Sequence, residues 1–272
     1  MTTLSISEKI SGEAYCDYFY ADGTKVLSSP KWAMSVKAAG SMRFRYNEEN
    51  ENRPRFFSRF FGSQREIAPV ELIHSKTVYA IEHASDIAGR TGDGIITNNP
   101  RLVPAVTVAD CMPIFLYEPK TRVFGCVHSG WRGTGIAAEA IRLAGKTYGA
   151  QAHDFLVVLG PHIQSCCYSV DKERADYFRR TFSEDCVSAL DENAGTYRLS
   201  LAKANLALLK KAGVKDENIA LCTDCTCCQK DAAGNFPFGS FRRETSATAG
   251  KPFTVQAAFC YFDGAENEQG EK

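Results

Sequence analysis

Short apolar runs alternate with amphipathic stretches along most of this chain. Runs rich in Val, Ile, Leu and Phe that are bounded by turn residues are typical of buried strands. They predict strands at Val103–Ala109, Ile114–Tyr117, Val123–Val127, Phe155–Leu159, Ile219–Cys222 and Phe253–Phe262. Apolar residues at helical spacing predict helices at Gly135–Tyr148, Lys172–Thr181 and Leu199–Lys211. Interleaved strands and helices predict an α/β fold, in which mixed β-sheet layers are flanked by helices and a site lies at strand ends.

The pattern runs on without an internal repeat or a low-complexity linker, so the 272 residues predict a single domain. We expect an N-terminal segment over 1–30, the domain over 31–263 and a polar tail over 264–272. The tail is short of apolar residues and is expected to fray.

Charge and cysteine content narrow the class of protein. The 32 Lys and Arg residues equal the 32 Asp and Glu residues, which indicates neither a nucleic acid partner nor an acidic membrane. No apolar run approaches the roughly 18–20 residues of a membrane span. The first residues lack the basic and apolar regions of a secretory signal, so the 11 Cys residues are expected to be mostly reduced thiols in a cytoplasmic protein. The sequence leaves the oligomeric state open, a homodimer included.

Three residues with metal-binding side chains lie at the ends of predicted strands. Cys111 follows the first of the six predicted strands, His128 follows the third, and His74 follows the apolar run Val70–Ile73. Alone, each would most often be an ordinary buried or hydrogen-bonded residue. Together they predict a His₂Cys metal site with an open coordination position, which is typical of a catalytic rather than a structural centre. In Asp110–Pro113, the proline is expected to stop a strand and to place the thiol at its end.

The segment from His128 to Gly135 predicts a strand, a glycine-rich turn and the start of a helix. Such a turn offers backbone N–H groups to an anion, and Arg132 adds a planar guanidinium suited to phosphate. The alternative is that Arg132 stacks on an aromatic ring or pairs with an acid to hold the turn.

Further polar residues have both a functional and a structural interpretation. Lys31–Arg65 carries eight Lys and Arg residues, including Arg53, and is either a phosphate-attracting arm or contains an amphipathic helix near Arg53–Phe61 with its rings buried and its arginines outside. His162 in Leu159–Ile163 lines the same pocket or caps a turn. Arg242 in Phe238–Glu244 brings a cation to the pocket rim or forms a surface ion pair.

Two cysteine clusters match metal-binding patterns only weakly. Within Cys222–Cys228 the C-x-x-C spacing occurs twice with Cys225 shared, but no separate second pair and no H-x-x-x-H follows at the spacing of a zinc finger. The adjacent residues Cys166 and Cys167 are expected to be buried, because neighbouring cysteines rarely bridge each other.

Four motifs resemble those of the laccase-domain family, first called multicopper polyphenol oxidase-like and now regarded as purine nucleoside phosphorylases with adenosine deaminase activity. The motifs are Thr107–Pro113, Val127–Gly133, Leu159–Ile163 and Ser240–Glu244, and the resemblance runs from about Asn52 to Tyr261. It implies zinc ligands at His74, Cys111 and His128, with copper as the alternative metal. Asp93–Thr97 is similar to a further stretch of the family. Leu72, Ser200 and the Pro-Phe-Gly before Ser240 depart from its usual pattern.

The resemblance implies phosphorolysis of adenosine, inosine or methylthioadenosine to the free base and ribose 1-phosphate, together with zinc-dependent deamination of adenosine. In this scheme Cys111, His128, Arg132 and Asp110 are catalytic, while Arg53, His162 and Arg242 bind substrate or phosphate. Asp110 or His162 would move protons beside a metal-activated water.

One alternative is a cysteine hydrolase or deamidase with Cys111 as nucleophile and His128 as base. Another is a copper-dependent polyphenol oxidase, but five histidines in all are too few for the additional trinuclear copper cluster of a laccase.

Overall fold

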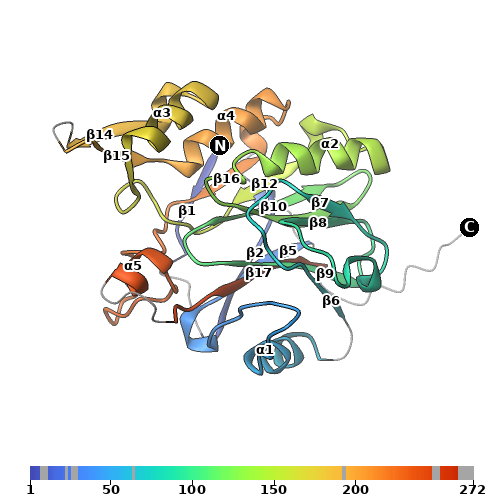
Figure 1. Ribbon diagram of the computed structural model, residues 1–272. Coiled ribbons are helices and arrows are strands. Elements are labelled where there is room, and N and C mark those ends of the chain that lie inside the picture. Colours follow the sequence, from blue (N-terminus) through green and yellow to red (C-terminus); the bar gives the residue numbers. More distant parts are fainter. Residues whose placement is uncertain are drawn as a thin grey trace, which may run out of the picture.

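The computed structural model describes residues 1–6, 12–21, 24–25, 30–62, 65–191, 194–246 and 252–262. Helices α2 (Ile136–Tyr148), α3 (Lys172–Thr181) and α4 (Leu201–Lys211) form an upper layer in Figure 1, two sheets follow beneath them, and α1 (Asn52–Phe61) lies at the bottom. The α/β architecture with mixed sheet layers and flanking helices is therefore confirmed.

The upper sheet has seven strands and mixed direction. Its order is β1 (Thr2–Leu4), β16 (Ile219–Cys222), β12 (Leu156–Leu159), β10 (Met112–Glu118), β11 (Val123–Ser129), β8 (Gly94–Thr97) and β7 (Val78–Ala80). Strand β10 runs antiparallel to both β11 and β12, whereas β12 and β16 are parallel neighbours.

The lower sheet has five strands, in the order β2 (Ala14–Tyr18), β5 (Lys31–Ser35), β17 (Gln256–Tyr261), β9 (Leu102–Val108) and β6 (Glu66–Pro69). Two small sheets contain β13 (Ser169–Asp171), β15 (Thr196–Leu199) and β14 (Val187–Asp191), and β3 (Tyr20–Ala21) with β4 (Thr24–Lys25). The remaining helices are the short α5 (Phe241–Ser246) and the 3₁₀ turns η1 (Lys37–Ala39), η2 (Ala84–Ile87), η3 (Ala152–Asp154), η4 (Glu184–Cys186) and η5 (Asp216–Asn218).

The alternation of side chains along the strands explains the layers. In β10, Ile114 and Leu116 belong to the core beneath the upper helices, whereas Phe115 and Tyr117 belong to the core between the two sheets. A strand that is apolar on both faces must be covered on both faces, so a central strand such as β10 reads as a continuous hydrophobic run. At the bottom, the Phe residues of α1 pack against Phe259 of β17.

Most predicted elements are present, with bounds that differ by a few residues. The interpretation of Pro113 as the end of a strand is wrong, because β10 begins at Met112 and includes this proline. Pro113 lies one residue beyond the last β10–β12 pair, Ile114 with Leu159, so its missing N–H removes no bond from that ladder. Residues 109–111 instead carry the chain from β9 in the lower sheet to β10 in the upper one.

The structure describes part of the expected N-terminal segment but not the expected C-terminal tail. Strands β1 and β2, from the expected segment 1–30, pair with β16 and β5 of the two large sheets. The expected tail 264–272 lies outside the described residues. Among the helices of the described part, none is long and apolar enough to cross a membrane.

Candidate metal centre and active site

His74, Cys111 and His128 converge on one point, as the sequence predicted. One ligand atom from each lies within 4.8 Å of the others, and the two imidazole rings are nearly perpendicular with centroids 4.9 Å apart. Cys111 directly precedes β10 and His128 is the penultimate residue of β11, its antiparallel neighbour. His74 does not end a strand, because β6 stops at Pro69 and the residue lies in the following irregular segment.

The buried carboxylate of Asp93 joins the two histidines. Its Oδ1 lies 2.9 Å from Nδ1 of His128 and also accepts a hydrogen bond from the backbone N–H of His74 at 2.9 Å. Its Oδ2 accepts from the N–H and the hydroxyl of Ser75. These bonds hold His74 at a φ of 59°, in the left-handed region that non-glycine residues rarely adopt. They also turn Nε2 of His128 toward Cys111, in the carboxylate–histidine arrangement typical of zinc sites.

The donor set and its packing fit a metal ion of the zinc type. Two imidazoles and one thiolate are ligands that zinc accepts, and three protein ligands leave the fourth position for substrate or water. Gly130, two residues after His128, packs against the side chains of His74, Cys111 and His128. A Cβ at this glycine would lie 2.9 Å from Sγ of Cys111, which shows that the side chains surround the point tightly on this side.

The same contacts shift the proton equilibria of two ligands. Burial acts to raise the pKa of the Cys111 thiol, but the neighbouring His128 and His74 outweigh burial and lower it to about 6. Burial acts to lower the pKa of His128, but Cys111 and Asp93 raise it to about 9. The thiolate is therefore readily formed at neutral pH, as metal binding and nucleophilic attack both require.

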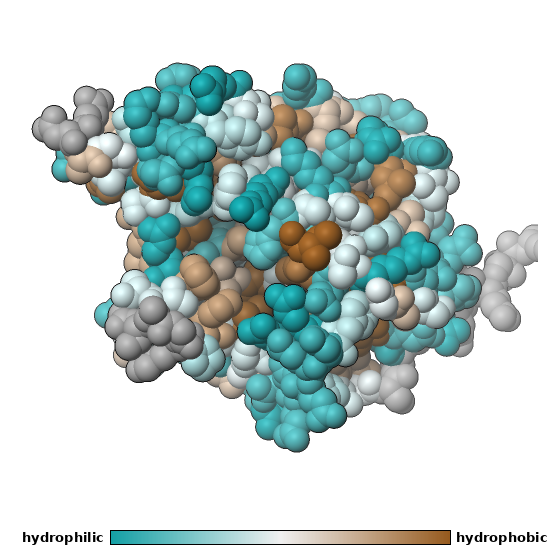
Figure 2. All heavy atoms as spheres, viewed as in Figure 1, coloured by the Kyte–Doolittle hydropathy of each residue, from teal (hydrophilic) through white to brown (hydrophobic). Residues whose placement is uncertain are grey.

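The three residues open onto a cavity of about 540 Å³, a volume within the range of small-molecule sites. Its aromatic and aliphatic lining consists of Phe44, Leu72, Ala109, Trp131, Ile163, Tyr168, Leu201, Phe241, Phe253 and Val255. On the face drawn in Figure 2, apolar side chains gather near the middle of the molecule between more hydrophilic surfaces. Ile73, next to His74, and Phe241 are both about half exposed.

Four arginines also line this cavity: Arg43, Arg45, Arg174 and Arg242. The guanidinium of Arg174 lies 4.4 Å from the ring centre of Trp131. Arg132 is exposed, stacks on the same ring at 4.9 Å and is absent from the lining residues of the cavity. This geometry favours the alternative interpretation, in which Arg132 holds the turn, and it places Arg174 closer to the cavity.

Asp110 and Arg242 lie together on the cavity wall. One carboxylate oxygen of Asp110 accepts from the hydroxyl of Thr226 at 2.7 Å, and the other accepts from the backbone N–H of Arg242 at 2.6 Å. The Arg242 guanidinium donates to the hydroxyl and the carbonyl of Ser169. Asp110 therefore ties the turn before Cys111 to the start of α5.

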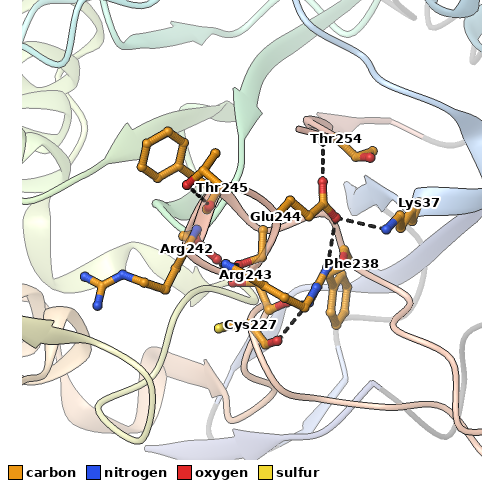
Figure 3. Close-up of polar contacts among 12 residues, drawn as sticks. Lys37, Cys227, Phe238, Arg242, Arg243, Glu244, Thr245 and Thr254 are labelled. Carbon is orange, nitrogen blue, oxygen red and sulfur yellow. Dashed lines mark hydrogen bonds and ion pairs between the residues drawn. The ribbon is translucent and has the colours of Figure 1, made fainter. Parts of the chain in front are cut away.

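Figure 3 shows that Arg242 and Arg243 extend in opposite directions from α5. Arg243 donates to the carbonyls of Thr226 and Cys227 and pairs with Glu244, whose carboxylate also binds Lys37. This network fixes α5, so that Arg242 is presented to the cavity from a rigid support.

Two predicted substrate-binding residues lie outside the lining of the cavity. His162 is buried, its Nδ1 lies 2.9 Å from the carbonyl of Gly160, and burial lowers its pKa to about 4. Arg53 is buried rather than pointing outward as the helix interpretation expected. It donates to the carbonyl of Met42 and stacks on Phe44 at 4.5 Å, and thus supports a lining residue from behind.

Several residues of the site escaped sequence reasoning. Asp93 belongs to a stretch that is similar to one of the family, but nothing in its local sequence indicates that it joins two histidines. Arg174 belongs to α3 and reaches the cavity only because β13 and α3 fold back toward the turn after β11. Of the departures from the family pattern, Leu72 lines the cavity, and Ser200 caps α4 by accepting from the N–H of Lys203.

Comparisons with known proteins identify the family to which this chain is similar. The family model described as multi-copper polyphenol oxidoreductase laccase matches residues 37–256. A protein of Geobacillus stearothermophilus named purine nucleoside phosphorylase YlmD is 34% identical over 159 residues, which cover 57% of this chain and 56% of that protein. A mouse protein named purine nucleoside phosphorylase LACC1 is 32% identical over 178 residues, or 59% of this chain and 41% of the mouse protein. The chain thus spans about half the length of these relatives.

Solved structures show the same fold over nearly the whole chain. The crystal structure of YlmD from Geobacillus stearothermophilus superimposes with a TM-score of 0.75 and 26% identity, over 89% of this chain and 95% of that one. All five histidines of this chain are described, and only His74 and His128 meet at the cysteine, which leaves no imidazole set for a trinuclear copper cluster. The chain belongs to the multi-copper polyphenol oxidoreductase laccase family.

Proposed function

We propose that this protein is a purine nucleoside phosphorylase that converts adenosine or inosine to the free base and ribose 1-phosphate, and methylthioadenosine to adenine and 5-methylthioribose 1-phosphate, and that it also deaminates adenosine with the help of zinc. The observation that carries the proposal is the opening of the His74, Cys111 and His128 set onto a cavity lined by aromatic rings and four arginines. Relatives that are 32% and 34% identical carry the name purine nucleoside phosphorylase.

The lining of the cavity suits both the purine base and the phosphate of such a reaction. Tyr168 and Phe44 offer ring faces on which a purine can stack, whereas Trp131 already carries the guanidinium groups of Arg132 and Arg174. Burial raises the pKa of the Tyr168 phenol, so its hydroxyl stays a hydrogen-bond donor at neutral pH. Arg174 offers a planar guanidinium with several N–H groups, which suits the oxygens of phosphate. Arg174 and Arg242 line the cavity and are the phosphate-binding arginines of this proposal, whereas Arg132 and Arg53, which the sequence also predicted, lie outside the lining and support it.

A zinc ion held by His74, Cys111 and His128 would supply Lewis-acid chemistry and activate water near neutral pH. Asp93 keeps the imidazole of His128 oriented and stabilises positive charge on it. In the proposal, Asp110 is the acid–base group beside Cys111 on the cavity wall. His162, being buried and neutral, supports that wall through its carbonyl, which accepts the N–H of Thr226 at 3.1 Å.

The test is incubation of the purified chain with adenosine or inosine, with and without phosphate, followed by chromatography. We expect hypoxanthine or adenine with ribose 1-phosphate when phosphate is present, and inosine from adenosine when it is absent. Cys111→Ser should lose the deamination. Wild-type protein that leaves both nucleosides unchanged at all phosphate concentrations would contradict the proposal.

The low pKa of Cys111 also favours a second candidate, a hydrolase or deamidase in which the Cys111 thiolate attacks an amide with His128 as its base. The two candidate functions differ in whether activity depends on a bound metal. If the chelator-treated protein keeps full activity toward an amide and loses it on alkylation of Cys111, the hydrolase is correct.

A further inference from the structure

A second group of cysteines lies outside the cavity, and the reaction proposed above does not use it. Cys166 and Cys167 sit in the loop after β12, whereas Cys225 and Cys228 sit in the loop after β16. Their four sulfurs all lie within 4.8 Å of one another. The expected burial of the adjacent pair is wrong, since Cys166 is exposed and Cys167 is partly exposed.

The topology explains how residues about sixty positions apart in the sequence meet. β12 and β16 are parallel neighbours, with Leu159 paired to Leu221, so the loops that follow them leave the same edge of the sheet. An isolated bridge between His162 and Cys225 extends this pairing into the loops. The two cysteine pairs meet because the strands that precede them are parallel neighbours. The four cysteines therefore need not be close in the sequence, as the ligands of a zinc finger are.

The distances between sulfurs match a tetrahedral centre. Sulfurs at the corners of a tetrahedron with zinc–sulfur bonds of about 2.3 Å lie about 3.8 Å apart. Cys166 Sγ lies 3.8 Å from Cys167 Sγ and 3.7 Å from Cys228 Sγ. Cys225 and Cys228 are the two cysteines of a C-x-x-C turn, the spacing that structural zinc sites use most often.

A backbone donor from the other loop faces the most buried sulfur. The N–H of Gln164, in the loop after β12, donates to Cys225 Sγ at 3.4 Å. This hydrogen bond joins the two loops and offsets negative charge on a thiolate at Cys225.

We propose that Cys166, Cys167, Cys225 and Cys228 form a second, structural zinc site with four thiolate ligands and no open position. Zinc binding releases the thiol protons to solvent and involves no oxidation or reduction. The site clamps the loops after β12 and β16 at the edge of the active-site cavity. Thr226, between the ligands of the second pair, donates to Asp110, and Tyr168, next to Cys167, lines the cavity. Loss of this zinc should therefore loosen the wall beside Cys111.

The experiment counts zinc in the full-length, untagged chain by native mass spectrometry and elemental analysis in reducing buffer. We expect one zinc to be lost in Cys228→Ser and in Cys166→Ser, whereas Cys227→Ser, the matched control from the same turn, keeps the wild-type number. Cys111→Ser should lose only the ion of the first centre. If the first centre holds no metal, wild type and Cys111→Ser will carry the same single zinc, and that zinc will still depend on Cys228.

A second readout does not depend on the folding of the Cys228 and Cys166 variants. Cys111→Ser protein reconstituted with Co²⁺ should show the intense thiolate-to-cobalt charge-transfer absorption of a four-sulfur site, and added zinc should remove it. The proposal is overturned if the reduced Cys111→Ser chain takes up neither metal. It is also overturned if Cys166 and Cys228 are recovered as a disulfide from freshly purified protein and the reduced chain binds no zinc.

Discussion

The carboxylate of Asp93 lies 2.9 Å from Nδ1 of His128 and at the same distance from the backbone N–H of His74. One buried side chain thereby sets the ring orientation of one histidine and the backbone conformation of the other. The two histidines belong to separate segments, so the geometry of the candidate metal centre depends on this acid as much as on the ligands themselves.

Asp93→Asn should keep the shape of the side chain but remove its charge. We expect zinc affinity to fall by about 10–100-fold, the usual effect of losing the partner of a metal-bound histidine. The measurement is zinc titration against a competing chelator, with circular dichroism to show that the fold is retained. Asp216→Asn, which removes an exposed partner of Lys210, is the control and should bind zinc as the wild type does. Equal affinity in the two variants would contradict the orienting role.

Gly130 provides a second test of the centre. Its Cβ position lies 2.9 Å from Cys111 Sγ and 3.6 Å from the ring of His74, so Gly130→Ala must displace a ligand. A clash of this kind costs about 1–3 kcal/mol and corresponds to zinc binding that is about 5–150-fold weaker. Gly145→Ala, in α2, serves as a control with a small change away from the centre. Unchanged zinc affinity in Gly130→Ala would mean that the three side chains do not hold the ion as described.

The thiol of Cys111 should show its low pKa directly. In protein stripped of metal by a chelator, the rate of alkylation of Cys111 should rise with pH through a midpoint of about 6, because only the thiolate reacts. Cys186 is the internal comparison, because burial raises its pKa to about 11 and its alkylation should stay slow over the same range. Peptide mass spectrometry measures both rates in one sample, and added zinc should suppress alkylation of Cys111. A midpoint for Cys111 near that of an ordinary thiol would contradict the coupling to the histidines.

Sequence patterns predicted the layers and the three convergent residues for clear physical reasons. A continuous apolar run such as that of β10 must be covered on both faces. Cys111 directly precedes β10 and His128 lies near the end of β11, and these two strands pair as neighbours. Pro113 was misread because its effect depends on where the β12 ladder ends, which only the register shows. Similarly, the meeting of Cys166 with Cys228 depends on the parallel pairing of β12 with β16.

The arginines were the weakest part of the prediction for a related reason. A guanidinium at the end of a long side chain can stack on a ring or reach a cavity from the same backbone position. Arg132 has the local sequence of an anion site but lies over Trp131, whereas Arg174 has no such context and lines the cavity. Local sequence therefore predicts the turn, but not the direction of the side chain.

The two arginines that stack on Trp131 provide a matched pair for testing phosphate binding. Arg174→Lys keeps the charge but removes the planar guanidinium, and we expect the apparent KM for phosphate to rise by about tenfold, or ~1.4 kcal/mol, with the phosphate-independent deamination of adenosine much less affected. Arg132→Lys should change neither reaction appreciably, because that side chain is exposed and outside the cavity lining. Steady-state kinetics of both reactions on both variants decide the assignment. A selective loss of phosphate affinity in Arg132→Lys would return the role to the arginine that the sequence predicted, and an equal loss of both reactions in Arg174→Lys would show that Arg174 supports Trp131 and does not bind phosphate.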